Sequence, residues 1–205
     1  MKQVDKAAYE FEKYSHLDRW ASYYYQLREV LRLEPRSILE IGVGDKVIGE
    51  YIKNNTAILY KTLDIAEDLH PDVIGGVTDI PIPSSSYDMV CAFEVLEHIE
   101  FSQFEKAVRE MKRVARKHVL ISLPHFGPPV KFGLKLPFLP EIKWAFKIPW
   151  HRPHTFNGQH YWEIGKKGYS VATVRSILAK EFTILKEFVP FENQYHHFFI
   201  LEKKG

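Results

Sequence analysis

The stretch Ser37-Ile-Leu-Glu-Ile-Gly-Val-Gly44 decides the fold. Its first five residues, 37–41, form a short apolar run typical of a buried strand. The run ends in Gly42 and Gly44, which let the backbone turn tightly and let a ligand approach without an intervening Cβ atom. Because residues 46–54 then favour a short helix, this stretch predicts the first unit of a parallel sheet.

Strands and helices alternate on both sides of this stretch. Upstream, residues 4–33 place apolar side chains at helical spacing, and Pro35 ends the predicted helix. Downstream, the patterns predict strands over 58–64, 73–74, 87–93 and 118–123, and a helix over 101–115. This alternation implies helical crossovers between parallel strands, with helices on both faces of the sheet.

The end of the chain follows a different pattern. A helix over about 170–181 precedes two β-rich runs, 182–189 and 196–202, which flank Pro190–Asn193. Their spacing suggests an antiparallel hairpin added to the sheet. We therefore predict an α/β fold, with a Rossmann-like seven-stranded, mainly parallel sheet, an antiparallel C-terminal hairpin and helices on both faces.

The predicted domain organisation is simple. A length of 205 residues with 45% hydrophobic residues suits one domain over 1–205. Residues 1–35 form an N-terminal helical cap, and residues 124–160 form an inserted lid segment that is too long for an ordinary connection.

Composition also bears on the compartment. The single cysteine, Cys91, excludes an intrachain disulfide framework and favours a reducing compartment, so we expect a cytoplasmic protein. The first residues lack the apolar region of a secretory signal. No run of about 18 apolar residues without charge predicts a membrane span.

Charge is divided unevenly along the chain. Residues 1–100 carry 10 Lys and Arg against 18 Asp and Glu, whereas residues 101–205 carry 18 against 8. Either the two halves lie side by side and cancel, or the basic half faces an acidic partner. Because no nucleic-acid reader motif is present, nucleic acid is not the expected partner. The oligomeric state is left open.

The glycine turn limits the choice of ligand. Asp64 ends the second predicted strand, 20 residues after Gly44, where a carboxylate can accept hydrogen bonds from ribose hydroxyls. A dinucleotide would need a third glycine where this chain has Val47. Glu40, just before the turn, favours a sulfonium or an ammonium group over a pyrophosphate. The alternative is that these residues only turn the chain and cap helices.

A second stretch narrows the choice further. Residues 79–98 read DIPIPSSSYDMVCAFEVLEH, and together with ILEIGVGD and TLDI they resemble the class I S-adenosylmethionine-dependent methyltransferases of the type-11 domain group. The resemblance covers roughly residues 36–124. It implies S-adenosyl-L-methionine as the cofactor and methyl transfer as the activity.

The resemblance also assigns roles by position. Glu40, Gly42 and Gly44 would surround the methionine end of the cofactor, and Glu94 would lie near the same portion. Asp64 would bind the ribose hydroxyls, while Ile65, Asp79 and Ile80 would line the adenine. The family often has a third glycine where this chain has Lys46.

The chemistry places few demands on the protein. Methyl transfer from a sulfonium is an in-line displacement, in which the protein mainly aligns the acceptor and excludes water. The expected acceptor is a small or lipid-like molecule methylated at O or N. If a base is used, His125 is best placed, directly after a strand end; His98, His151, His154 and His160 are further candidates.

One alternative to an enzyme and one expectation about metal follow from the same residues. A non-catalytic protein could retain the cofactor-binding fold. No metal is expected, because Pro153 prevents a regular helix from presenting both His151 and His154, and no cysteine or carboxylate cluster near them completes a ligand set.

The inserted segment has its own composition. Residues 126–153 interleave six aromatic residues with basic ones, which are Lys131, Lys135, Lys143, Lys147 and Arg152 against Glu141. Three interpretations stay open: packing of the rings on the sheet edge, a lid over the acceptor, and peripheral contact with a membrane surface.

Overall fold

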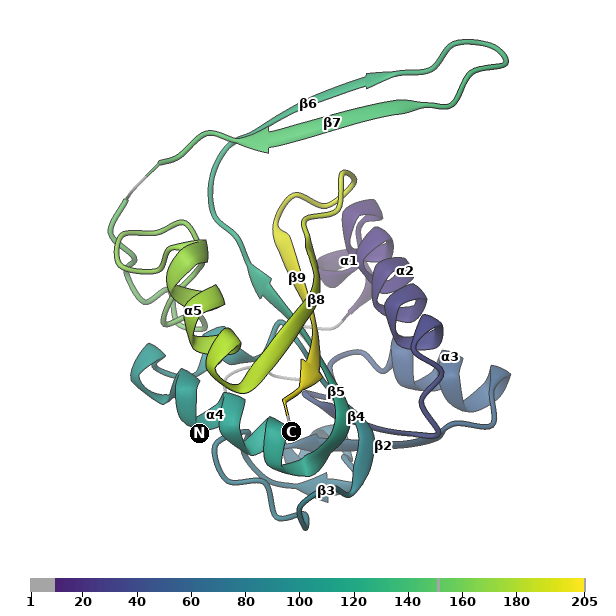
Figure 1. The fold of residues 1–205 in the computed structure, drawn as a ribbon, viewed down its shortest axis with the longest axis vertical. Coiled ribbons are helices and arrows are strands. Elements are labelled where there is room, and N and C mark those ends of the chain that lie inside the picture. The colour runs from purple at the N-terminus through teal and green to yellow at the C-terminus, as the bar shows by residue number, and fades with distance from the viewer. Residues whose placement is uncertain (1–9, 151, 205) are drawn as a thin grey trace.

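The computed structural model of the chain describes residues 10–150 and 152–204. One seven-stranded sheet forms its centre, in the order β3-β2-β1-β4-β5-β9-β8 (Figure 1). The strands are β1 (Ser37–Ile41), β2 (Leu59–Asp64), β3 (Val73–Ile74), β4 (Tyr87–Phe93), β5 (Ala115–Pro124), β8 (Phe182–Phe188) and β9 (His196–Lys203). The first five are parallel, and β9 joins β5 and β8 in antiparallel pairs. The predicted fold class is therefore confirmed.

Helices cover both faces of this sheet (Figure 1). They are α1 (Phe11–Tyr14), α2 (Leu17–Arg32), α3 (Val47–Asn55), η2 (Glu67–Leu69), η3 (Leu96–His98), α4 (Phe101–Val114) and α5 (Val171–Glu181). The predicted N-terminal helix is interrupted between α1 and α2, and its residues 4–9 lie outside the described part. Within the described residues, no helix is long and apolar enough to cross a membrane.

Successive side chains of each strand pack into two separate cores, one on each face of the sheet. In β1, Leu39 and Ile41 pack with α4 and α5, whereas Ile38 packs with α2 and α3. Because successive residues of a strand point to opposite faces, a fully buried strand supplies both layers. Cys91 lies in the second core, where it is 1% exposed and packs among apolar side chains.

The inserted segment contains a hairpin that the sequence did not predict. Strands β6 (Pro129–Leu134) and β7 (Ile142–Lys147) pair only with each other and extend away from the sheet (Figure 1). Val130, Phe132 and Leu134 pair with Phe146, Trp144 and Ile142, so one face of the hairpin is wholly apolar. All six side chains of that face are at least 39% exposed.

Candidate functional site

The glycine turn adopts a backbone that favours glycine. Gly42 and Gly44 have φ values of +85° and +52°, which residues with a Cβ rarely adopt. The amide of Gly42 donates to the carbonyl of Leu63, which ties the turn to β2. A Cβ atom at Gly42 would lie 2.5 Å from Cγ2 of Val95, so the turn packs directly on the loop after β4.

Lys46 occupies the place of the third family glycine. It has φ +67°, in the same left-handed region, and immediately precedes α3. The position therefore keeps the conformation for which glycine is favoured, although the residue is a lysine.

Asp64 holds the two loops at this edge of the sheet together. Its two carboxylate oxygens accept from the amides of Val43 and Ala66, each at 2.8 Å. The first bond reaches the glycine turn. Asp64, which is expected to bind the ribose, therefore also supports the loop that would bind the methionine end of the cofactor. Ile65 follows it and is 53% exposed.

Glu40 points away from this rim, to the face covered by α3. Its carboxylate accepts from the hydroxyl of Tyr60 at 2.5 Å. Burial raises the pKa of Glu40 to about 8, an effect that the Tyr60 bond partly opposes. The carboxyl group is therefore mostly neutral at pH 7, and it lines a small cavity of about 130 Å³ with Lys46 and Lys53.

Asp79 and Ile80 have different surroundings. Asp79 is exposed, and its amide donates to the carbonyl of Gly76. Ile80 is 2% exposed within the main core. Its amide donates to Glu110 and its carbonyl accepts from Arg113.

Glu94 begins the loop after β4 in a strained conformation. Its φ is +55°, and its amide donates to the carbonyl of Ser122. The carboxylate is buried, with one oxygen 3.6 Å from Nε2 of His196. Burial raises the pKa of Glu94 to about 8.

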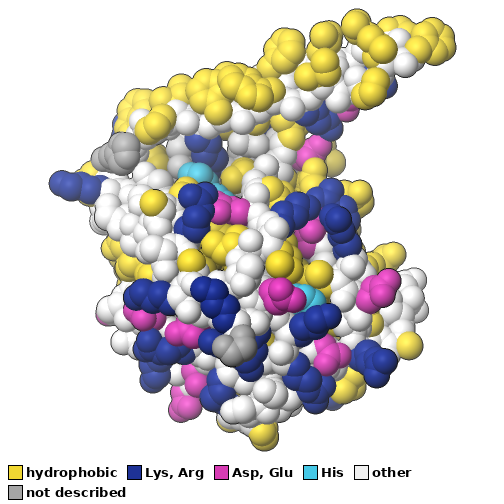
Figure 2. All heavy atoms as spheres, viewed as in Figure 1, with side chains coloured by type: hydrophobic (Ala, Val, Ile, Leu, Met, Phe, Trp, Pro, Cys, Tyr) yellow, Lys and Arg dark blue, Asp and Glu magenta, His cyan; other side chains and the backbone are white. Residues whose placement is uncertain are grey.

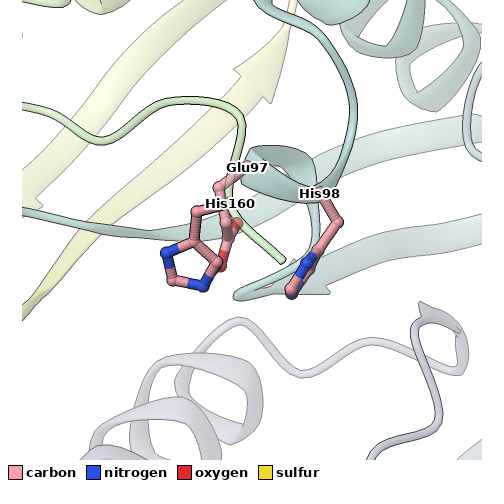
Figure 3. Close-up of side chains that lie close together, drawn as sticks. All are labelled: Glu97, His98 and His160. Atoms are coloured by element: carbon pink, nitrogen blue, oxygen red, sulfur yellow. The ribbon is translucent and has the colours of Figure 1, made fainter. Parts of the chain in front are cut away.

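A cluster that the sequence did not predict lies beside this loop. Donor atoms of Glu97, His98 and His160 lie within 4.8 Å of one another (Figure 3). Glu97 and His98 come from η3, and His160 comes from the segment before α5. Burial, followed by the nearby His160, lowers the pKa of His98. The residues come from distant parts of the sequence, so spacing gave no signal for the cluster.

Other polar groups extend the same region. Glu163 accepts from the hydroxyl of Tyr195 at 2.9 Å and pairs with Nδ1 of His160 at 3.0 Å. His154 contacts the carbonyl of His160 through Nε2. His151 lies outside the described residues.

His125 lies on the face of the sheet that α5 covers. Its Nδ1 is 3.0 Å from Nδ1 of His197, whose Nε2 is 2.8 Å from Glu187. Because the carboxylate accepts from His197, the proton between the two imidazoles belongs to His125, which leaves its lone pair on Nε2. Burial, with Lys147 and His197 nearby, lowers the pKa of His125 to about 3.

His196 and His197 separate the two polar regions. They point to opposite faces of β9, as successive residues of a strand do. Nδ1 of His196 is 2.8 Å from the hydroxyl of Ser22, on the α2 side. His125 lines a cavity of about 520 Å³ between the base of the hairpin and the start of α5. The structure thus brings His98 and Glu94 to the glycine turn and gives His125 a different set of neighbours.

The comparisons agree with this geometry. Residues 39–123 match the family described as a methyltransferase domain. Among curated proteins, none matches the sequence. Of the solved structures, magnesium protoporphyrin IX methyltransferase from Synechocystis PCC 6803 is 12% identical, with a TM-score of 0.62 over 100% of this chain and 90% of that one.

Two further solved structures have similar folds. The 1,6-didemethyltoxoflavin-N1-methyltransferase of Burkholderia thailandensis is 12% identical, with a TM-score of 0.62 over 97% of this chain and 85% of that one. A putative S-adenosylmethionine-dependent methyltransferase from Listeria monocytogenes is 13% identical, with a TM-score of 0.59 over 91% of this chain and 100% of that one.

These findings confirm the resemblance to class I S-adenosylmethionine-dependent methyltransferases of the type-11 group. Residues 39–123 match the methyltransferase-domain family, and the chain shares its fold with these solved structures.

Proposed function

We propose that this protein transfers a methyl group from S-adenosylmethionine to O or N of a small or lipid-like acceptor. The main support is the rim formed by the carboxyl ends of the parallel strands. There Gly42, with its left-handed backbone, packs on Val95, and Asp64 accepts a hydrogen bond from the Val43 amide of the same turn. The domain match supports the proposal, as do the two solved methyltransferases of similar fold that contain S-adenosylhomocysteine.

The proposed cofactor site follows this rim. Gly42, Gly44 and Glu94 would contact the methionine end, and Asp64 would accept from the ribose hydroxyls. Ile65 and Asp79 are exposed where the adenine would lie. Two of the family positions would act indirectly: Ile80 is buried and would hold Asp79 in place, and Glu40 would act through Tyr60.

The reaction needs alignment more than acid–base chemistry. The sulfonium supplies the reactivity, and the chain orients the acceptor and excludes water. We place the acceptor in the cavity of about 520 Å³ that His125 and Phe146 line. With a pKa of about 3, His125 is a weak base, so its proposed role is to position the acceptor by accepting a hydrogen bond at Nε2 from an O–H or N–H other than the one that is methylated.

We also propose that the hairpin contacts an anionic lipid surface. Figure 2 shows its apolar side chains gathered along the outer edge of the molecule. The exposed aromatic residues Phe132, Trp144 and Phe146 lie on this face, and Phe138 lies at the tip. Aromatic side chains of this kind favour the boundary between headgroups and acyl chains.

The lysines of the hairpin favour an anionic lipid partner over a second copy of this chain. The opposite face of the hairpin carries Lys131, Lys143 and Lys147. Lys131 and Lys143 bond Glu192 of the turn between β8 and β9, so this face is directed to the body of the protein. The apolar outer face of the hairpin would lie against the acyl chains, and the lysines of the opposite face would lie near the anionic headgroups. Together with the single cysteine, this fits a cytoplasmic protein that binds the inner membrane surface.

An acceptor assay tests the proposed activity. The purified chain is incubated with S-adenosylmethionine and a panel of hydroxyl and amine acceptors, including lipid-like ones, and S-adenosylhomocysteine is measured. Release that depends on the acceptor is expected. Asp64→Asn should weaken cofactor binding, whereas Asp88→Asn, at the opposite end of the sheet, should not. Cofactor binding without transfer to any acceptor would favour the non-catalytic alternative.

Vesicle sedimentation tests the lipid contact. The protein should sediment with phosphatidylcholine vesicles that contain phosphatidylserine. The paired substitutions Phe132→Ser and Trp144→Ser should weaken this binding at least about tenfold. Leu185→Ser, at an exposed position of β8, serves as the control. A failure to sediment, or a dimer that the paired substitutions dissociate, would overturn the proposal.

A further inference from the structure

The side chains of Glu97, His98 and His160 form a convergent donor set. Their ligand atoms lie within 4.8 Å of one another, and Nε2 of His160 is 4.0 Å from Oε1 of Glu97 (Figure 3). Donors bound to one cation at 2.0–2.2 Å are separated by roughly 3–4 Å. A small inward movement of these side chains would therefore complete a coordination shell.

Both imidazoles are oriented as metal-binding histidines usually are. Nδ1 of His98 is 3.0 Å from the carbonyl of Gln159, and Nδ1 of His160 is 3.0 Å from the carboxylate of Glu163. Since carbonyl and carboxylate oxygens only accept, each Nδ1 carries the proton and each lone pair is on Nε2. Metal-binding histidines commonly donate their second nitrogen to such outer partners.

Glu97 is a buried carboxylate without a hydrogen-bond donor. Its side chain is 0% exposed, and within the described part of the chain neither oxygen accepts a hydrogen bond from another residue. One oxygen of the neighbouring Glu94 is in the same condition. Buried carboxylates are normally paired or bound to metal, so a bound cation would give these oxygens the partner that the described residues do not supply.

The backbone holds the two halves of the set in register. The amide of Tyr161 donates to the carbonyl of Glu97 at 2.8 Å. The indole of Trp162, which is fully buried, donates to the carbonyls of Leu96 and Ile99. His160 is thereby fixed next to η3 by its own neighbours.

We propose that Glu97, His98 and His160 bind one divalent transition-metal ion. Imidazole favours ions such as Zn²⁺, Co²⁺ or Fe²⁺, and the carboxylate adds a harder ligand that also suits Mn²⁺. Three protein ligands leave positions open for water or for an acceptor.

The location gives the ion a task in the proposed reaction. Val95 lies between the metal-binding residues and the glycine turn, 2.5 Å from where a Cβ of Gly42 would be. This step rests on the proposed methyl transfer. A hydroxyl acceptor bound to the ion loses its proton to water; its oxygen then bonds the methyl carbon as the S–C bond breaks, and the electron pair stays on sulfur. The metal site would thus favour an oxygen acceptor.

Metal binding can be tested without any activity. The full chain, treated with EDTA and dialysed, is titrated with Co²⁺, whose visible absorption reports the ligands, and then with Zn²⁺ in competition. One ion per chain is expected. Glu97→Gln and His160→Gln should each weaken binding at least about tenfold. His16→Gln, an exposed histidine at the start of α2, should leave it unchanged.

Stability separates a metal ligand from a structural residue. Without metal, Glu97→Gln should unfold at the same or higher urea concentration than wild type, because it removes a buried carboxyl without donors. Added Zn²⁺ should stabilise wild type but not this variant. A wild type that binds neither ion, or binding that both substitutions leave unchanged, would overturn the site.

The activity assay then distinguishes the two proposals. If EDTA abolishes methyl transfer, Zn²⁺ or Co²⁺ restores it and S-adenosylhomocysteine still binds, both proposals are supported. Metal binding without methyl transfer to any acceptor would contradict the proposed function and leave the metal site intact.

Discussion

Gly42 and Gly44 form a matched pair for testing the glycine turn. Both have positive φ values, but an added Cβ would lie 2.5 Å from Val95 at Gly42 and would meet nothing within 4 Å at Gly44. Alanine in a left-handed conformation costs about 1–2 kcal/mol, offset by about 0.4–1 kcal/mol because the unfolded chain loses freedom. Gly44→Ala should therefore lower the free energy of unfolding by roughly 1 kcal/mol.

Gly42→Ala carries an additional steric cost. Carbon atoms prefer separations of about 3.5–4 Å, and forcing such a contact in a packed region costs about 1–3 kcal/mol. We therefore expect Gly42→Ala to lower the free energy of unfolding by roughly 2–4 kcal/mol. Val95→Ala would leave only the Val95 Cβ contact, at 3.8 Å, so adding it to Gly42→Ala should recover the steric part.

Urea unfolding followed by circular dichroism measures the four variants and the coupling between positions 42 and 95. A positive coupling of about 1–3 kcal/mol is expected. If Gly42→Ala were no more destabilising than Gly44→Ala, or if Val95→Ala gave no recovery, the packing of the turn on the loop after β4 would be wrong.

Three further predictions concern the same edge of the sheet and the core beneath it. Lys46→Gly removes a lysine from a left-handed conformation, which should stabilise the fold by about 1–2 kcal/mol. The greater freedom of glycine in the unfolded chain costs about 0.5–1 kcal/mol. The substitution should therefore raise the urea midpoint, and a lower midpoint would show that Lys46 makes a stabilising contact. Burial raises the pKa of Asp72, but bonds from Lys61 and Thr62 outweigh it and hold that pKa below its usual range. The stabilising effect of the Asp72 carboxylate is thus present above the unfolded pKa of about 3.9 and is lost as the pH falls through the folded pKa. Asp72→Asn should lower the free energy of unfolding by about 1–2 kcal/mol at pH 7 and by much less at pH 3. A loss of stability independent of pH would contradict this. Tyr60→Phe removes the donor to buried Glu40 and should cost about 1–3 kcal/mol at pH 7, whereas Tyr51→Phe, on an exposed position of α3, should cost little.

Strands and helices near the first core were predictable because their patterns are local. The apolar run 37–41 and its glycines gave β1 and the turn, and the periodicity of 101–115 gave α4, which ends at Val114. In β5 the strand begins three residues earlier than predicted, at Ala115, because Ala115 pairs with Tyr87 across a shifted register.

The hairpin in the inserted segment was missed for a physical reason. Its six apolar side chains alternate with lysines and small residues, as in a strand. The many prolines of the segment, however, are typical of an irregular loop, and the hairpin has no buried partner strand that would make its pattern more apolar. The side chains also do not pack on the sheet edge, so the simple packing interpretation does not hold for them.

The polar clusters depended on contacts between distant segments. Glu97 and His98 were visible as part of a family stretch, yet only the fold brings His160 to them. Likewise, the pairing of His125 with His197 follows from the register of β5 with β9, which no local pattern specifies.

A structure of the protein with S-adenosylhomocysteine bound tests the central claim most directly. The account predicts the adenosine between Asp64, Ile65 and Asp79, with the amino-acid end at Gly42, Gly44 and Glu94. An unoccupied rim at saturating ligand, or the nucleoside in the cavity beside His125 and Lys147, would contradict it.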